Sequence, residues 1–262
     1  MTGNNGKGII IQERDRELLR EIAVMRVIDR EQAKRAAGFG STTRANTRLL
    51  GLVRSGLLRR FFLGSDGVGQ KALYALSEKG ARLVGVPCRG PRRRQDETLV
   101  ADLSVVHQLR VNDLYCRVKF GGIPNPGARF VRWMAFHERI EANLSLIPDG
   151  YLEIAASAKP LTAFLEVDLG HERGNVWPTK VMSYLRYAVS GAFAKQFGHP
   201  QFRTLVVGPS DKRVQSLRKA TAKVTEKIFW FTTFDAIDRD GFWSPIWQRP
   251  TGDAKLPLLE LP

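Results

Sequence analysis

The sequence predicts an α/β (α+β) fold with two domains. Apolar residues in the first third of the chain recur at helical spacing and are followed by two short strand-like runs. A segment rich in proline and arginine then precedes a region in which strand-like and helical patterns alternate. The chain has 262 residues, 43% of them hydrophobic, so each domain can bury a core of its own.

Charge gives the first indication of what the protein binds. Lys and Arg number 41 against 26 Asp and Glu, so the formal net charge is +15. A chain this basic attracts polyanions by releasing their condensed counterions. Charge alone fits RNA, DNA or an anionic membrane, whereas a basic surface that serves only solubility needs no clustering of its cations.

Composition also narrows the cellular setting. No run of 18 apolar residues exists, and the first residues, MTGNNGKG, lack the basic start and apolar core of a secretion signal. Cys88 and Cys116 match no metal-ligand spacing, and we expect them to be structural thiols. These observations predict a cytoplasmic protein that does not bind membranes.

Three helices are expected before the first strand. In residues 11–25 the apolar side chains recur at helical spacing, so that one face packs inward. A second, short helix over residues 30–37 ends at the sequence GFG. Ser, Thr and Thr at positions 41–43 can cap a third helix that runs to about residue 55.

The third helix has an apolar face and a basic, polar face. The apolar side chains that attach it to the core are Leu49, Leu50, Leu52 and Val53. The side chains expected to face outward are Arg44, Asn46, Thr47 and Arg48. Such a surface is suited to contact with a polyanion.

The runs LLRRFFL and KALYAL read as strands joined by the turn-rich GSDGVGQ, and SEKGARLVG begins a further helix. With RANTRLLGLVRSGLLRR before them, residues 11–85 resemble winged helix-turn-helix domains. That resemblance implies a third helix in the major groove and a hairpin on the backbone. The DNA contacts it implies are Arg44, Asn46 and Arg48 on the helix and Arg59, Arg60 and Lys71 on the hairpin. Winged helices also serve as protein-docking modules, and a helix face that carries arginines is often only solvated.

The predicted division places a winged helix-turn-helix domain at residues 1–85, a basic linker at 86–97 and a second domain at 98–262. The linker reads VPCRGPRRRQDE. Its arginines, Arg92, Arg93 and Arg94, could follow a DNA backbone, or the segment could be a solvated, mobile connection.

The second domain is expected to have the element order αβββαβαβ. The predicted helices cover residues 98–118, 176–190 and 212–227. The predicted strands cover residues 128–136, 145–154, 161–169, 204–208 and 229–234.

Three carboxylates, Asp149, Glu166 and Asp168, lie in two of these strands. Alternate residues of a strand share a face, so Glu166 should stand with Asp168, and Asp149 can meet Glu166 if the two strands are neighbours. Like charges that close repel unless a cation or a proton lies between them. Mg²⁺ is bound by one or two carboxylates together with water and phosphate oxygens. The pattern therefore suggests a site for phosphodiester cleavage.

Pro148-Asp149 and the later Glu166-x-Asp168, in this order of elements, resemble the PD-(D/E)xK nucleases, whose fold is a restriction-endonuclease-like mixed sheet. The resemblance implies that Asp149 and Glu166 bind Mg or Mn. The family has a lysine where this chain has Asp168, and an acid cannot supply the positive charge needed there. Lys180 on the following helix could replace that lysine, or Asp168 could become a further metal ligand.

Most of the chain resembles the replication-relaxation family, which is similar to the MobC-type relaxases of mobilisable plasmids. The supporting motifs are the winged helix, IPDGYLEI, FLEVDLG, a helix with Lys followed by Tyr, and SPIWQRP. The resemblance implies a metal-dependent nickase that binds double-stranded DNA at a transfer or replication origin, together with other mobilisation or replication proteins. It implies catalytic roles for Asp149, Glu166, Asp168 and Lys180, with His107 as a lesser candidate.

Each of these residues also has an ordinary structural explanation. The carboxylates could pair with arginines, and His107 could be a hydrogen-bonded packing residue. Tyr184 and Tyr187, on the face of Lys180, are more often half-buried than nucleophilic. An alternative function is therefore a catalytically impaired, nuclease-fold DNA-binding factor that acts as a regulator or accessory protein at an origin. The chain has no GxxxxGK[ST] loop for nucleotide hydrolysis and no zinc or thiol-nucleophile pattern.

Overall fold

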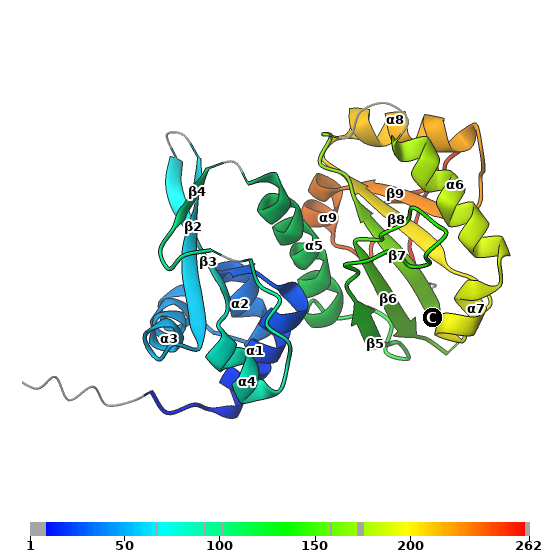
Figure 1. Cartoon of the computed structure of the whole chain (residues 1–262). Coiled ribbons are helices and arrows are strands. Elements are labelled where there is room, and N and C mark those ends of the chain that lie inside the picture. The colour runs from blue at the N-terminus through cyan, green and yellow to red at the C-terminus, as the bar shows by residue number, and fades with distance from the viewer. Residues whose placement is uncertain are drawn as a thin grey trace, which may run out of the picture. The chain divides into compact units, whose positions relative to one another are not determined.

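The computed structural model has a mixed α/β fold, as predicted. It describes residues 9–65, 68–91, 93–100, 102–157, 159–171 and 176–259. The chain divides into two compact units, Met1–Cys116 and Arg117–Pro262, and the helix α5 (Leu103–Phe120) runs from the first into the second. Figure 1 shows the elements of both units.

The first unit has the predicted order of three helices, a hairpin and a further helix. Its elements before α5 are α1 (Glu13–Met25), β1 (Ile28–Asp29), α2 (Arg30–Ala36), α3 (Thr42–Arg54), β2 (Leu58–Ser65), β3 (Val68–Leu76), α4 (Glu78–Val84) and β4 (Thr98–Val100). The sheet order is β1-β3-β2-β4, with β2 and β3 antiparallel.

Short polar side chains fix where the helices of the first unit begin. Ser41 Oγ accepts a hydrogen bond from the Arg44 N–H at 3.3 Å, at the predicted start of α3. Asp29 and Ser77 cap α2 and α4 in the same way. These bonds satisfy N–H groups that have no partner inside the helix, which is why the sequence located the helix starts well.

The segment after α4 differs from expectation. Residues 98–100 form the strand β4 beside β2, parallel to it, although they were predicted to begin a long helix. The preceding residues are also bound to β2, because Asp96 N–H donates to Arg60 O and Phe62 N–H donates to Glu97 O. Long-range pairing with the hairpin explains why residues 98–100 are a strand instead of a helix, and why Asp96 and Glu97 are bound to β2. Arg92 lies outside the described residues.

The second unit is built on a seven-stranded mixed sheet with the order β11-β10-β9-β8-β7-β6-β5. Its strands are β5 (Arg129–Met134), β6 (Gly150–Ala155), β7 (Leu161–Val167), β8 (Arg203–Gly208), β9 (Phe229–Thr233), β10 (Trp247–Gln248) and β11 (Lys255–Leu256). Its helices after α5 are α6 (Val176–Val189), α7 (Ala192–Phe197), α8 (Asp211–Ala222) and α9 (Phe234–Asp240). Strands β7, β8 and β9 are parallel to one another, whereas β5, β6, β10 and β11 pair antiparallel to their neighbours.

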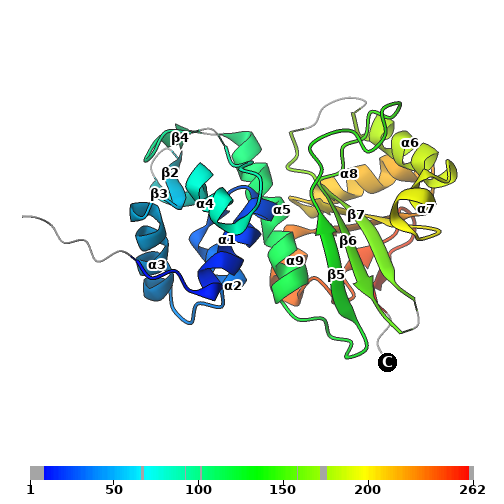
Figure 2. The same cartoon turned by 60° about the horizontal axis from the view of Figure 1, so that its bottom comes forward.

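Helices α6, α7 and α8 cover one face of this sheet, and α9 lies on the other (Figures 1 and 2). The covered face carries a cluster of aromatic side chains in which Phe164 on β7 contacts Tyr184 on α6 and Phe193 on α7. Alternate strand residues reach this cluster, as the pleat of a sheet requires. Glu166 follows Phe164 by two residues, so the sheet directs it toward the same helices.

The sequence did not predict α7, α9, β10 or β11. All four are at most seven residues long, too short for a clear periodic pattern. Trp247 of the SPIWQRP motif begins β10, which extends the sheet beside β9. In the part of the chain that is described, no helix has both the length and the apolar character that crossing a membrane requires.

Candidate functional site

Two carboxylates meet where β6 and β7 pair. Gly150 lies opposite Leu165 in this antiparallel pair, so Asp149, the residue before β6, lies opposite Glu166. Asp149 Oδ2 accepts a hydrogen bond from the Val167 N–H at 2.7 Å. Strand pairing therefore brings together two acids that are 17 positions apart in the sequence.

Glu166 is buried and bound by two side chains of α6. Lys180 Nζ lies 2.8 Å from Glu166 Oε2, and Tyr184 donates its O–H to Glu166 Oε1 at 2.5 Å. Glu166 itself is 2% exposed. Lys180 and Tyr184 are four residues apart on one helix face, which is why both reach the same carboxylate.

Burial raises the pKa of Glu166 to about 7. The positive charge of Lys180 opposes this rise, and the negative charge of Asp149 adds to it. Burial and the nearby Glu166 carboxylate also raise the pKa of the Tyr184 hydroxyl well above its usual value. Near neutral pH, Glu166 can therefore hold or release a proton while Tyr184 remains protonated.

Asp168 is held by a different helix. Arg213 of α8 donates two hydrogen bonds to it, Nε to Oδ1 at 3.0 Å and Nη2 to Oδ2 at 2.6 Å. The Gly170 N–H donates a third bond to Oδ1 at 2.6 Å. This fork-shaped pair neutralises Asp168, as one of the ordinary structural explanations anticipated.

The pair of Asp149 and Glu166 meets the minimum that Mg²⁺ or Mn²⁺ needs, which is one or two carboxylates completed by water and phosphate oxygens. Their mutual repulsion would be relieved by a cation. Both oxygens of Glu166 already have hydrogen-bonded or charged partners. Among the residues that the structure describes, no group of three His, Cys, Asp or Glu side chains could hold a metal ion. A substrate phosphate would therefore have to complete the ligand set.

Of the remaining candidates, Tyr187 has its hydrogen-bond partner outside this cluster. Tyr187 is fully buried and donates its O–H to Gln196 Oε1 at 2.7 Å, and burial raises the pKa of Tyr187 to about 12. His107 belongs to the first unit, whereas Asp149 and Glu166 belong to the second.

The first unit presents a basic surface on α3. Arg44, Thr47 and Arg54 are exposed and lie at positions i, i+3 and i+10, on one side of the helix. Asn46 is half-buried. The buried side chains Ala45, Leu49 and Leu52 hold the opposite side against the core.

Arg48 has a structural role instead of the outward position expected for it. Its Nε donates to Asp15 Oδ1 at 2.7 Å, and its Nη2 donates to Ile10 O at 2.6 Å. Asp15 is fully buried. Burial alone would raise the pKa of Asp15, but hydrogen bonds from Arg48 and from the Gln12 N–H outweigh that effect and hold this pKa below its usual value.

The predicted phosphate contacts of the hairpin also have partners inside the first unit. Arg59 donates to Pro91 O at 2.9 Å and Arg93 O at 3.3 Å, and thereby attaches the segment after α4 to β2. The charged partners of the other two side chains are Asp96 for Arg60 and Asp29 for Lys71. The Lys71 side chain remains 53% exposed.

Sequence reasoning missed two residues of these sites. Arg54 shares the side of α3 that carries Arg44, and its spacing of ten residues could have indicated this. Arg213 could not have been identified, because its pairing with Asp168 spans 45 residues and depends on the packing of α8.

Together these features define a basic two-unit α/β protein. Asp149, Glu166 and Lys180 form a carboxylate–lysine cluster at its larger sheet. A family model described as replication-relaxation matches residues 19–200, more than half of the chain. The protein therefore belongs to the replication-relaxation family, and this membership suggests a role in the replication or mobilisation of plasmids or mobile elements, with DNA as a partner. Neither the curated proteins nor the solved structures that were compared with the chain include a match.

Proposed function

We propose that the protein binds double-stranded DNA at an origin-type site of a plasmid or mobile element and nicks one strand there. Family membership and the net charge of +15 both support DNA as the partner. The two activities are assigned to different units, with recognition in the winged helix-turn-helix of the first unit and cleavage in the nuclease-like second unit.

The observation that supports DNA binding is the exposed basic side of α3. In winged helices the third helix enters the major groove, where base edges are read, while cations around it contact phosphates. Arg44 and Asn46 lie in the first turns of α3, and Arg54 lies at its end. We assign base contacts to Arg44 and Asn46 and a phosphate contact to Arg54. Arg48 is left out, because it binds the buried Asp15.

Duplex binding can be tested with matched double variants. Arg44→Ala with Arg54→Ala removes two charges from α3, and Arg20→Ala with Arg82→Ala removes two exposed charges from α1 and α4. Loss of two phosphate or base contacts should weaken binding at least about tenfold and reduce the salt slope by about 2. The control should bind nearly as wild type. Equal losses in both variants would refute the assignment of α3.

The observation that supports cleavage is the contact of Lys180 with Glu166 beside Asp149. Lys180 supplies the positive charge that is missing at position 168. Asp149 and Glu166 would hold Mg²⁺ or Mn²⁺ when substrate phosphate is present, and the cation would supply positive charge at the scissile phosphate. Lys180 would then orient the attacking water and supply positive charge beside it.

A nicking assay tests this assignment. Supercoiled plasmid that carries the native origin region is incubated with Mg²⁺ or Mn²⁺ and with wild type, Asp149→Asn, Glu166→Gln or Lys180→Met. We expect relaxed circles from wild type alone, with duplex affinity unchanged in all three variants. Wild-type nicking rates in the variants would exclude this cluster as the catalytic centre.

A second candidate function is recognition without cleavage. It is favoured by the 2% exposure of Glu166 and by the pairing of Asp168 with Arg213, because neither carboxylate is open to solvent. In that case wild type would retard the origin fragment without relaxing the plasmid. The carboxylate–lysine cluster would then serve the stability of the second unit.

A further inference from the structure

The second unit contains a pocket at the opposite end of the parallel strands from Glu166. It lies where β7, β8 and β9 begin, and its volume is about 430 Å³, within the range of small-molecule sites. Glu166 is the second-last residue of β7, whereas Leu161, its first residue, lines the pocket. At about 3.3 Å per residue, the two sites are on the order of 15 Å apart along β7.

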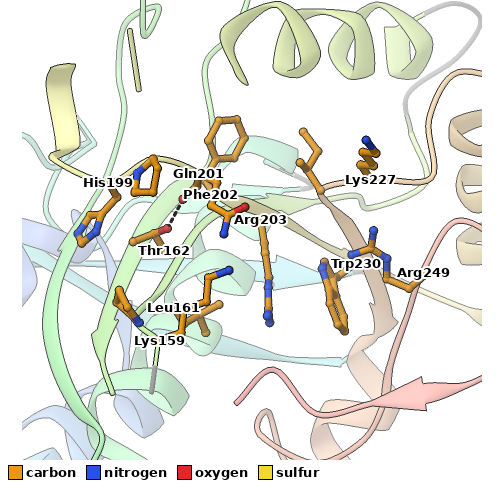
Figure 3. A pocket seen from close by; sticks show the side chains of 13 residues that line it. Lys159, Leu161, Thr162, His199, Gln201, Phe202, Arg203, Lys227, Trp230 and Arg249 are labelled. Carbon is orange, nitrogen blue, oxygen red and sulfur yellow. Dashed lines mark hydrogen bonds between the residues drawn. The ribbon is translucent and has the colours of Figure 1, made fainter. Parts of the chain in front are cut away.

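The pocket is strongly cationic. Four of its lining residues are Lys159, Arg203, Lys227 and Arg249, and none of the described lining residues is Asp or Glu (Figure 3). The two lysines are exposed, so they lie at the rim. Four positive charges around a hollow with no Asp or Glu among its described lining residues create a local potential that favours an anion.

A tryptophan holds the two arginines in place. The guanidinium carbon of Arg203 lies 4.6 Å from the centre of the Trp230 ring, and that of Arg249 lies 4.9 Å from it. Figure 3 shows Trp230 between the two side chains. Their backbone partners are Leu258 O, 2.7 Å from Arg203 Nη1, and Glu226 O, 2.5 Å from Arg249 Nη2.

This arrangement prepares the guanidinium groups for an anion before any ligand arrives. Stacking on an indole ring and a backbone hydrogen bond restrict each side chain, so little conformational freedom remains to be lost on binding. A guanidinium has five N–H donors, and the bond from Arg249 to Glu226 O uses one of them. The two positive charges that share one ring also repel each other, and a bound anion would relieve this repulsion.

Apolar residues also line the pocket, among them Pro160, Pro200 and Ile228. A small inorganic ion would leave these residues uncovered, whereas a phosphate ester with a sugar and a base would use both the cations and the apolar part of the lining. The geometry fits a ligand with one anionic end and one flat or apolar end.

We propose that this pocket binds a nucleotide unit, whose phosphate is attracted by the positive charges of Arg203, Arg249 and the two rim lysines. Two sources share this chemistry, namely one nucleotide of a single DNA strand and a free nucleotide. The inference does not depend on the proposed function, because it rests on residues that belong neither to α3 nor to the carboxylate–lysine cluster.

Charge-matched variants of the full chain can test the proposal. Lys159→Ala with Lys227→Ala removes the two rim charges, and Lys195→Ala with Lys219→Ala removes two exposed charges of α7 and α8 that do not line the pocket. Arg249→Lys keeps the charge but removes the planar fork. Binding of thymidine 5′-monophosphate is measured by calorimetry, and binding of a labelled single-stranded dT 20-mer by fluorescence anisotropy.

We expect the rim variant to bind at least about fivefold more weakly than the control, because the loss of phosphate contacts is specific to the pocket. Arg249→Lys should also bind several-fold more weakly than wild type. Weaker binding of the 20-mer identifies a DNA strand as the source, and weaker binding of the monophosphate alone identifies a free nucleotide. Equal affinities of the rim variant and the control for both probes, or no binding of either probe by wild type, would overturn the proposal.

Discussion

The buried Glu166 should make the stability of the second unit fall as the pH rises. Its pKa in the folded state is about 7, above the ordinary value of 4.5. Between these values the folded unit binds more protons than the unfolded chain, so a rise in pH favours unfolding. At about 1.4 kcal/mol per pH unit, the difference between these two pKa values lowers the free energy of unfolding by about 3 kcal/mol. Glu166→Gln removes the ionisable group and with it this loss.

Tryptophan fluorescence can follow this unit separately from the first. All five tryptophans of the chain lie in the second unit, namely Trp133, Trp177, Trp230, Trp243 and Trp247. Urea unfolding of wild type and Glu166→Gln would be measured at several pH values from 4.5 to 7.5. The free energy of unfolding of the variant, relative to wild type, should increase by about 3 kcal/mol over this range.

Glu138→Gln provides the control, because Glu138 is an exposed acid of the same unit. Its free energy of unfolding should follow that of wild type at every pH. If the Glu166→Gln curve also runs parallel to wild type, Glu166 does not carry a raised pKa and the electrostatic reasoning is wrong.

Three further outcomes are expected. Arg48→Ala should destabilise the first unit by about 2 to 3 kcal/mol near neutral pH, since it leaves the buried Asp15 without its ion-pair partner. Circular dichroism in urea would measure the free energy of unfolding. The difference between variant and wild type should shrink as the pH falls through the lowered pKa of Asp15. Asp168→Asn should cost about 2 kcal/mol by weakening the Arg213 fork, and an unchanged fluorescence-detected unfolding midpoint would contradict it. Gly80→Ala should lower the melting temperature of the first unit by several degrees, because the Cβ of the alanine would lie 2.1 Å from the Leu57 carbonyl oxygen. A shift below about 1 °C would argue against this close contact.

Local signals explain what the sequence predicted well. The starts of α2, α3 and α4 depend on a single capping side chain next to a periodic apolar pattern, and both are visible in a short window. The five longer strands of the second unit were found because apolar residues recur in each of these short segments. The meeting of Asp149 with Glu166 followed from one further assumption, that β6 and β7 are neighbours.

The sequence by itself determined the α/β class, the order of the main elements, the basic character and the motifs that resemble the replication-relaxation family. Only the tertiary structure decided which charges are paired. Arg48 faces Asp15 instead of solvent, Asp168 binds Arg213, and the arginines around Trp230 form a pocket that no motif indicated. The physical reason is that an ion pair or a stacked ring depends on the distance between side chains that are tens of residues apart. That distance is set by the packing of whole helices and strands, which local patterns do not encode.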